Sequence, residues 1–186
     1  RLNRMRTIDI SLTDCKRQLT TLVACVFDPD DVVEIRRLPS TMSTWHTAGD
    51  LADQAGALTA ENDRGENIYV GANPRKRRGG KSGADIDVCR CLFTDFDGCT
   101  PDVALNMWES KGLPLCTLTV NSGHGVHCYL RLAEPINPAT WTELQRDLAA
   151  LVGSDPCVCD PPRIMRLPGF TNHKPPSAEC EIVSSD

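Results

Sequence analysis

The chain has 186 residues, with 25 Asp and Glu against 20 Lys and Arg and a formal net charge of −5. This length suits one domain, or two small lobes that share a core, and suffices for folding without disulfides or metals. With 40% hydrophobic and 24% charged residues, the composition excludes global disorder, a collagen-like rod and a coiled coil. No apolar run approaches the length of a membrane span, so we expect a cytoplasmic protein with no membrane partner.

The ten cysteines are too few, at about 5% of the chain, for a disulfide scaffold. Most lie in or beside apolar runs, where a free cysteine behaves as a small hydrophobic residue. The close pairs Cys89/Cys91 and Cys157/Cys159 are separated by one residue, whereas zinc sites usually separate their paired cysteines by two. We therefore expect reduced structural thiols and no zinc site.

The first half of the chain predicts a small α/β lobe. Residues 31–38 predict a strand, residues 47–61 are rich in Ala and Leu and predict a helix, and residues 68–70 predict a short strand. Residues 75–83 contain five basic residues and three glycines. This basic loop must be exposed.

The second half begins with a strongly β-like run at residues 88–96, which we expect to be a central strand. A helix follows between the N-cap Thr100 and Gly112. A hairpin, a second helix and two final strands are predicted at residues 115–132, 137–153, 164–167 and 181–183. Along the second helix, one apolar stripe comprises Trp141, Leu144, Leu148 and Leu151. Because helices and strands alternate while two strands pair directly, we expect an α+β fold with a mixed or antiparallel sheet.

Asp95 and Asp97 are the sharpest chemical feature. Residues two apart in a strand project from the same face, so both carboxylates lie side by side near the end of the 88–96 strand. Such a pair suits Mg²⁺ or Mn²⁺, because these ions prefer hard oxygen ligands. A strand that simply ends in an Asp-Gly turn is the alternative interpretation.

Two further segments carry polar residues in a constrained backbone. In the hairpin, His127, Tyr129 and Arg131 share one strand face beside a glycine-rich turn whose N–H groups can hold phosphate oxygens. Residues 161–174 carry three permanent cations and no acid, with prolines and a glycine restricting the backbone. Rigidly placed cations beside carboxylates fit recognition of a triphosphate.

Together these features resemble the catalytic domain of the archaeo-eukaryotic primase superfamily, most closely the primase-polymerase branch of plasmid, phage and mobile-element replication proteins. The resemblance covers residues 73–174 and follows the family order of motifs: Asp95-x-Asp97, the Ser122–His127 turn and strand, Asp160, and Arg166-x-Pro-Gly with Asn172 and Lys174. Asn73-Pro74-Arg75 is similar to an upstream element of the plasmid-type branch. The resemblance implies one catalytic domain, with an N-terminal lobe at 1–84 and an RRM-like catalytic lobe at 85–186.

The resemblance also implies template-dependent nucleotidyl transfer on a single-stranded DNA template with nucleoside triphosphates. Asp95, Asp97 and Asp160 would be catalytic and would hold two Mg²⁺ or Mn²⁺ ions, one activating a 3′-hydroxyl and one bridging the triphosphate. The implied nucleotide-binding residues are Ser122, His127, Arg166, Asn172 and Lys174. Candidate contacts to nucleotide or template are Arg75, Lys81, His124 and Arg163. Since the chain lacks an initiator Met and ends abruptly, we expect a fragment of a longer replication protein with a downstream helicase or DNA-binding domain.

Two assignments within this resemblance stay open. His124 satisfies a Ser-x-His motif with Ser122, but we favour His127 because it lies on the strand after the last glycine. Asp155 competes with Asp160 as the third aspartate; we favour Asp160 because a strand-like segment leads into it and Arg163 follows at family-like spacing.

Other functions fit the sequence less well. Residues 95–100 also resemble the opening motif of haloacid-dehalogenase-type phosphatases, with Asp95 as nucleophile, but the Lys that such enzymes need is absent from residues 112–173. A P-loop fails because Arg75 occupies its first glycine position. A catalytically inactive nucleic-acid-binding initiator module remains an alternative. The net charge argues against a nucleic-acid partner, whereas the two basic stretches argue for one.

Overall fold

The computed structural model describes the backbone of residues 2–186 and the side chains of residues 12–186. The helices are α1 (Leu2–Val26), α2 (Ala55–Asn62), α3 (Pro101–Glu109) and α4 (Pro138–Val152), with 3₁₀ segments η1 (Ala48–Gln54) and η2 (Gly83–Asp85). In the described part of the chain, no helix has both the length and the apolar character that crossing a bilayer would need.

The strands form two sheets. Sheet A has the order β2 (Ser43–Thr47), β1 (Val32–Leu38), β3 (Asn67–Gly71), β7 (Ile164–Arg166). Sheet B has the order β4 (Cys89–Asp97), β6 (Gly125–Ile136), β5 (Leu118–Asn121), β9 (Ala178–Ser185), β8 (Phe170–Asn172). Among the described residues every strand pair is antiparallel. The predicted α+β class is therefore confirmed, and the doubly wound fold behind the phosphatase alternative is wrong for this chain.

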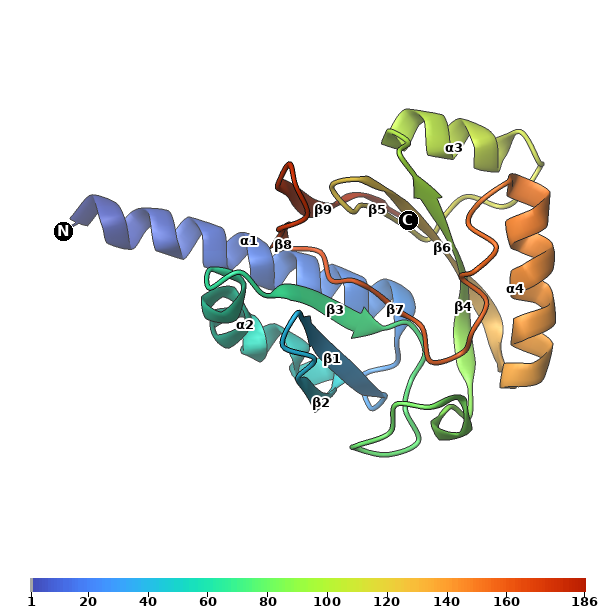
Figure 1. Ribbon diagram of the computed structural model, residues 1–186, viewed down its shortest axis with the longest axis horizontal. Coiled ribbons are helices and arrows are strands. Elements are labelled where there is room, and N and C mark those ends of the chain that lie inside the picture. The colour runs from blue at the N-terminus through green and yellow to red at the C-terminus, as the bar shows by residue number, and fades with distance from the viewer. Residues whose placement is uncertain (1) are drawn as a thin grey trace.

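Two elements join the sheets (Figure 1). Strand β7 comes from the second half of the chain but pairs with β3, so the sheets do not strictly follow the predicted lobe boundary at residue 84. Helix α1 packs against α2 on one side and against β5, β6 and β9 on the other. Its buried residues Leu19, Leu22 and Val26 recur every three or four positions, as expected for a helix with one face in the core. The sequence patterns did not predict this helix.

Strand β4 is an edge strand of sheet B, not the predicted central strand. Its open edge is covered by α4, which runs alongside it (Figure 1). Trp141 Nε1 donates to the Cys91 carbonyl at 2.7 Å, while Gln145 accepts from the Phe93 amide at 3.1 Å and donates to the Phe93 carbonyl. Two helix side chains thus take the place of a neighbouring strand, satisfying backbone groups that an exposed edge would leave open.

The predicted stripe of α4 is correct only in part. Trp141 and Leu148 are buried, but Leu144 and Leu151 are 41% and 48% exposed. The buried face instead includes Gln145, Ala149 and Val152. Gln145 can be buried because its side chain bonds to the backbone of Phe93. A polar residue with buried partners is invisible to a pattern based on hydrophobicity alone.

The remaining predicted elements match, except that the 47–61 helix divides into η1 and α2. The structure adds two short strands, β2 and β8, that the sequence patterns did not predict. All ten cysteines are free thiols, and those of β4 are buried as expected. Cys157 and Cys159, by contrast, lie in a loop, with Cys157 exposed.

Candidate active site

Strand β4 brings Asp95 and Asp97 to the end of sheet B beside the 122–124 turn. Its register pairs Asp95 with His127 and Asp97 with Gly125 on β6. The close approach requires glycine at position 125, since a Cβ there would lie 2.5 Å from the Phe96 carbonyl oxygen. The glycine at the end of the turn therefore allows β4 and β6 to approach each other closely beside the two carboxylates.

A hollow of about 200 Å³ opens beside this carboxylate pair. It is lined by residues from four separate segments: Tyr69 on β3, Asp95 and Asp97 on β4, Ser122, His124 and His127 of the hairpin, and Ile164, Met165, Arg166, Asn172 and Lys174 after α4. All five predicted nucleotide-binding residues thus meet in one place, although up to 52 positions separate them in the sequence. Tyr69 was missed, because a tyrosine in a short strand carries no distinguishing signal.

His127 is buried at 3% exposure. Burial, together with the nearby Arg166 cation, lowers the pKa of the His127 imidazole to about 3. The ring is therefore neutral near pH 7, and its 3.7 Å separation from Asp95 Oδ1 is not an ion pair there. Within the described structure Nδ1 has no hydrogen-bond partner. His127 thus lines the hollow with a neutral ring whose buried Nδ1 has no partner among the described residues.

Arg166 and Lys174 supply the positive charge of the hollow. Arg166 lies over the Tyr69 ring, 4.9 Å from its centroid, and donates to Asn67 Oδ1 at 2.8 Å. This packing holds the guanidinium in one place, since cation–π contact and the hydrogen bond act together. Lys174 is exposed, and its backbone N–H donates to Asn172 Oδ1.

Ser122, Asn172 and His124 line the same hollow but bond mainly to the protein. Ser122 Oγ donates to the Gly125 carbonyl at 3.0 Å, and Asn172 Nδ2 donates to the Ser122 carbonyl at 2.8 Å. His124 Nε2 lies 2.9 Å from the Lys174 carbonyl oxygen, to which it can donate. These contacts tie β8 and the following loop to the hairpin, so Ser122 and Asn172 build the wall of the hollow. The other two residues of the predicted His127 face do not line the hollow: Tyr129 is in the core, and Arg131 pairs with Asp28.

Asp95 lies in an unfavourable electrostatic position. Burial, and then the neighbouring carboxylates of Asp97 and Asp155, raise its pKa to about 6, which Arg163 and Arg166 only partly offset. The Asp155 N–H donates to the Asp95 carbonyl at 3.0 Å, and Asp155 lines a second hollow of about 340 Å³ together with Asp95 and Asp97.

Asp160, the favoured third aspartate, is placed differently. Its Oδ1 accepts from Arg163 Nε at 2.6 Å, and it lines neither hollow. Asp155, the alternative in the sequence, is the third carboxylate that the structure brings to the pair. The strand-like lead-in that favoured Asp160 does not form, since residues 153–163 are an irregular loop.

The donor chemistry fits a divalent cation. Asp95, Asp97 and Asp155 offer carboxylate oxygens, and their mutual repulsion would be relieved by positive charge. Among residues 12–186, no three His, Cys, Asp or Glu side chains lie close enough together to hold one metal ion. This arrangement suits Mg²⁺, which proteins typically hold through one or two carboxylates while waters and substrate phosphates complete the shell.

Three of the four candidate contacts to nucleotide or template do not line the hollow. Arg75 is 3% exposed and forms a buried ion pair with Glu34, so the prediction that it contacts nucleotide or template is wrong. Lys81 lies in the exposed basic loop, 5.6 Å from the centroid of the Trp45 ring. Arg163 is partly buried and bound to Asp160, although its charge reaches Asp95.

Comparison with solved structures identifies the fold. The archaeo-eukaryotic primase domain of the primase-polymerase of cyanophage S-2L aligns with a TM-score of 0.74 and 24% identity, over 91% of this chain and 90% of that chain. The catalytic domain of primase RepB′ in complex with initiator DNA aligns with a TM-score of 0.72 and 16% identity, over 92% and 85%. A longer RepB′ chain, of which 56% is covered, aligns with a TM-score of 0.70 and 16% identity.

No protein-family model and no curated protein sequence matches the chain. At these identities the structural likeness concerns the fold. The chain has the fold of primase-polymerase catalytic domains, which confirms the fold that the sequence motifs predicted.

Proposed function

We propose that this chain is the catalytic domain of a template-dependent nucleotidyltransferase that makes or extends primers during plasmid, phage or mobile-element replication. One observation carries the proposal: the carboxylate pair, a neutral buried histidine, an anchored arginine and a lysine line one hollow in a primase-polymerase fold. A phosphatase gains no support from this fold, and a pure nucleic-acid binder has no use for acidic side chains facing a phosphate backbone.

The residues divide the work by charge. Arg166 and Lys174 would bind and neutralise the triphosphate, and His127 would donate a hydrogen bond to a phosphate oxygen without adding charge. Asp95 and Asp97 would hold Mg²⁺ or Mn²⁺, with Asp155 as the third carboxylate in place of Asp160. When bound, the cation would offset charge on the phosphates and favour the attacking hydroxyl as a nucleophile.

Positioning is the main contribution expected of the protein, since phosphoryl-type transfer needs little proton chemistry from side chains. Asn172 and Ser122 support the hollow by tying β8 to the hairpin. Asn67 and Tyr69 hold Arg166. The triphosphate would thus meet an arginine that is already oriented.

The basic loop at residues 75–83 is the proposed contact to single-stranded DNA. Its exposed cations are Lys76, Arg77, Arg78 and Lys81. Trp45 Nε1 donates to the Gly80 carbonyl at 3.1 Å, and Arg78 donates to the Trp45 carbonyl at 2.7 Å, so the loop is braced on β2. Exposed cations beside a partly exposed aromatic ring are typical of surfaces that bind single-stranded nucleic acid.

The test is template-directed nucleotide incorporation with Mg²⁺ or Mn²⁺. We expect incorporation by the wild-type chain and its loss in Asp95→Ala/Asp97→Ala. The matched control is Asp147→Asn, which removes an exposed carboxylate on α4 and should leave incorporation unchanged. If the wild type incorporates nothing but binds DNA, the chain is the inactive binding module.

A further inference from the structure

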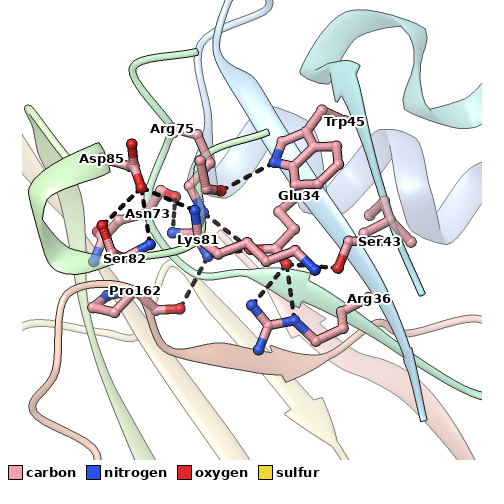
Figure 2. A network of polar contacts seen from close by, with 12 residues as sticks. Glu34, Arg36, Ser43, Trp45, Asn73, Arg75, Lys81, Ser82, Asp85 and Pro162 are labelled. Carbon is pink, nitrogen blue, oxygen red and sulfur yellow. Dashed lines mark hydrogen bonds and ion pairs between the residues drawn. The ribbon is translucent and has the colours of Figure 1, made fainter. Parts of the chain in front are cut away.

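Glu34 is a fully buried carboxylate in the middle of β1. Its Oε1 accepts hydrogen bonds from Arg36 Nε at 2.8 Å and Ser43 Oγ at 2.9 Å. Its Oε2 accepts from Arg75 Nη2 at 2.8 Å and Nε at 3.2 Å (Figure 2). Although burial acts to raise the pKa of Glu34, these hydrogen bonds lower it below its ordinary value, so the carboxylate stays ionised.

Arg75 connects this carboxylate to the loop that follows α4. Its Nη1 donates to the Asn73 carbonyl at 3.1 Å, and its Nη2 donates to the Pro162 carbonyl at 2.9 Å. Position 71 must be glycine for the guanidinium to lie there, because a Cβ would be 2.6 Å from Nη2. The guanidinium makes these contacts with three nitrogen atoms, whereas a lysine has a single nitrogen and cannot make all of them at once.

The segment 72–75 binds three successive carbonyl groups of that loop. Asn73 Nδ2 donates to Pro161 at 3.0 Å, Arg75 Nη2 to Pro162 at 2.9 Å and the Ala72 N–H to Arg163 at 2.8 Å. Because Pro161 and Pro162 have no N–H, the loop has two fewer backbone donors of its own. The Asn-Pro-Arg element therefore recognises the backbone of residues 161–163.

The loop so held carries Arg163 to the carboxylates. Arg163 binds Asp160 and the Cys157 carbonyl, and its positive charge acts on Asp95. The Arg166 guanidinium, by contrast, is held by Asn67 and Tyr69, and the backbone N–H of Lys174 by Asn172, independently of Arg75. The loop from Asp155 to Arg163 can therefore move without releasing the cations that face the triphosphate.

We propose that Glu34, Arg75 and Asn73 form a positioning clamp that fixes residues 155–163 and so sets where Asp155 and Arg163 lie relative to Asp95. None of the three touches the hollow. The clamp acts through the loop, and its effect on turnover rests on the proposed nucleotidyl transfer. The effect of the clamp on the order of the loop does not depend on that function.

Arg75→Lys and Asn73→Ala test the clamp, with Arg36→Lys as the matched control. Arg36 also pairs with Glu34, at 2.7 Å, but it has no contact with the loop. Hydrogen exchange at the amides of residues 157–160 and 163 gives the first measurement. We expect at least tenfold faster exchange in Arg75→Lys and Asn73→Ala, and no change in Arg36→Lys. Equal exchange in all folded variants would overturn the clamp.

Steady-state incorporation gives the second measurement. We expect kcat to fall about tenfold or more in Arg75→Lys and Asn73→Ala, because small displacements of positioned groups cost large factors in rate. The Kd for the nucleoside triphosphate should stay within about threefold. Equal loss in Arg36→Lys would mean a general structural role and would contradict the clamp. If Arg75→Lys fails to fold, Asn73→Ala decides. If the wild type incorporates nothing, the proposed function fails while hydrogen exchange still tests the clamp.

Discussion

Removing the charge of Asp95 should stabilise the protein while abolishing nucleotide incorporation. In the folded chain the pKa of Asp95 is raised from 3.8 to about 6 by burial and by the Asp97 and Asp155 carboxylates. At about 1.4 kcal/mol per pH unit, keeping this group ionised costs the fold about 3 kcal/mol at pH 7 without divalent ions. Asp95→Asn keeps the shape and removes that cost.

Urea unfolding at pH 7 in the presence of a chelator measures the difference. Because the folded-state pKa is raised, the cost is absent below about pH 4, appears as pH rises, and is complete above about pH 6 to 7. The advantage of Asp95→Asn should therefore vanish at pH 4, and Mg²⁺ should narrow it at pH 7. Asp147→Asn serves as control, with a change within about 0.5 kcal/mol. A destabilised Asp95→Asn at pH 7 would refute the reasoning.

Three further outcomes are expected. Gln145→Met leaves the Phe93 amide and carbonyl without their buried partner and should lower the free energy of unfolding by about 3 kcal/mol in a urea titration; the exposed Arg146→Met is its control, and an equal effect of both would contradict the edge-strand role. Asp155→Asn should reduce single-turnover incorporation about 100-fold or more, and Asp160→Asn less than tenfold; the reverse order would restore Asp160 as the third carboxylate. Arg77→Glu/Arg78→Glu should weaken binding of single-stranded DNA, measured by fluorescence anisotropy, and make its salt dependence shallower; unchanged affinity would place the template elsewhere.

Sequence reasoning located the hollow well because its motifs are local. Each motif can be recognised from a few neighbouring residues. The three motifs are the Asp-x-Asp strand end, the glycine-rich turn and the Arg166–Lys174 segment. Their order along the chain identified the fold, although no sequence comparison matches the chain. Local sequence patterns also predicted most strands, since their apolar runs are bounded by turn residues.

Long-range partners could not be predicted in this way. In the sequence, Arg75 is one more cation of a basic loop. Only the fold reveals that it forms an ion pair with the buried Glu34. Asp155 and Asp160 lie five residues apart in an irregular loop, and their roles depend on which one reaches β4. The edge position of β4 could not be predicted either. Its open edge is covered by Gln145, a polar residue whose partners are backbone groups of another element.

Single-nucleotide addition to primer–templates that differ only in the templating base tests the central claim most directly. The wild-type chain with Mn²⁺ or Mg²⁺ should add the nucleotide complementary to each template and release one pyrophosphate per addition, while Asp97→Asn should add none. Addition that ignores the template base, or equal addition by Asp97→Asn, would contradict template-dependent nucleotidyl transfer at the Asp95–Asp97 pair.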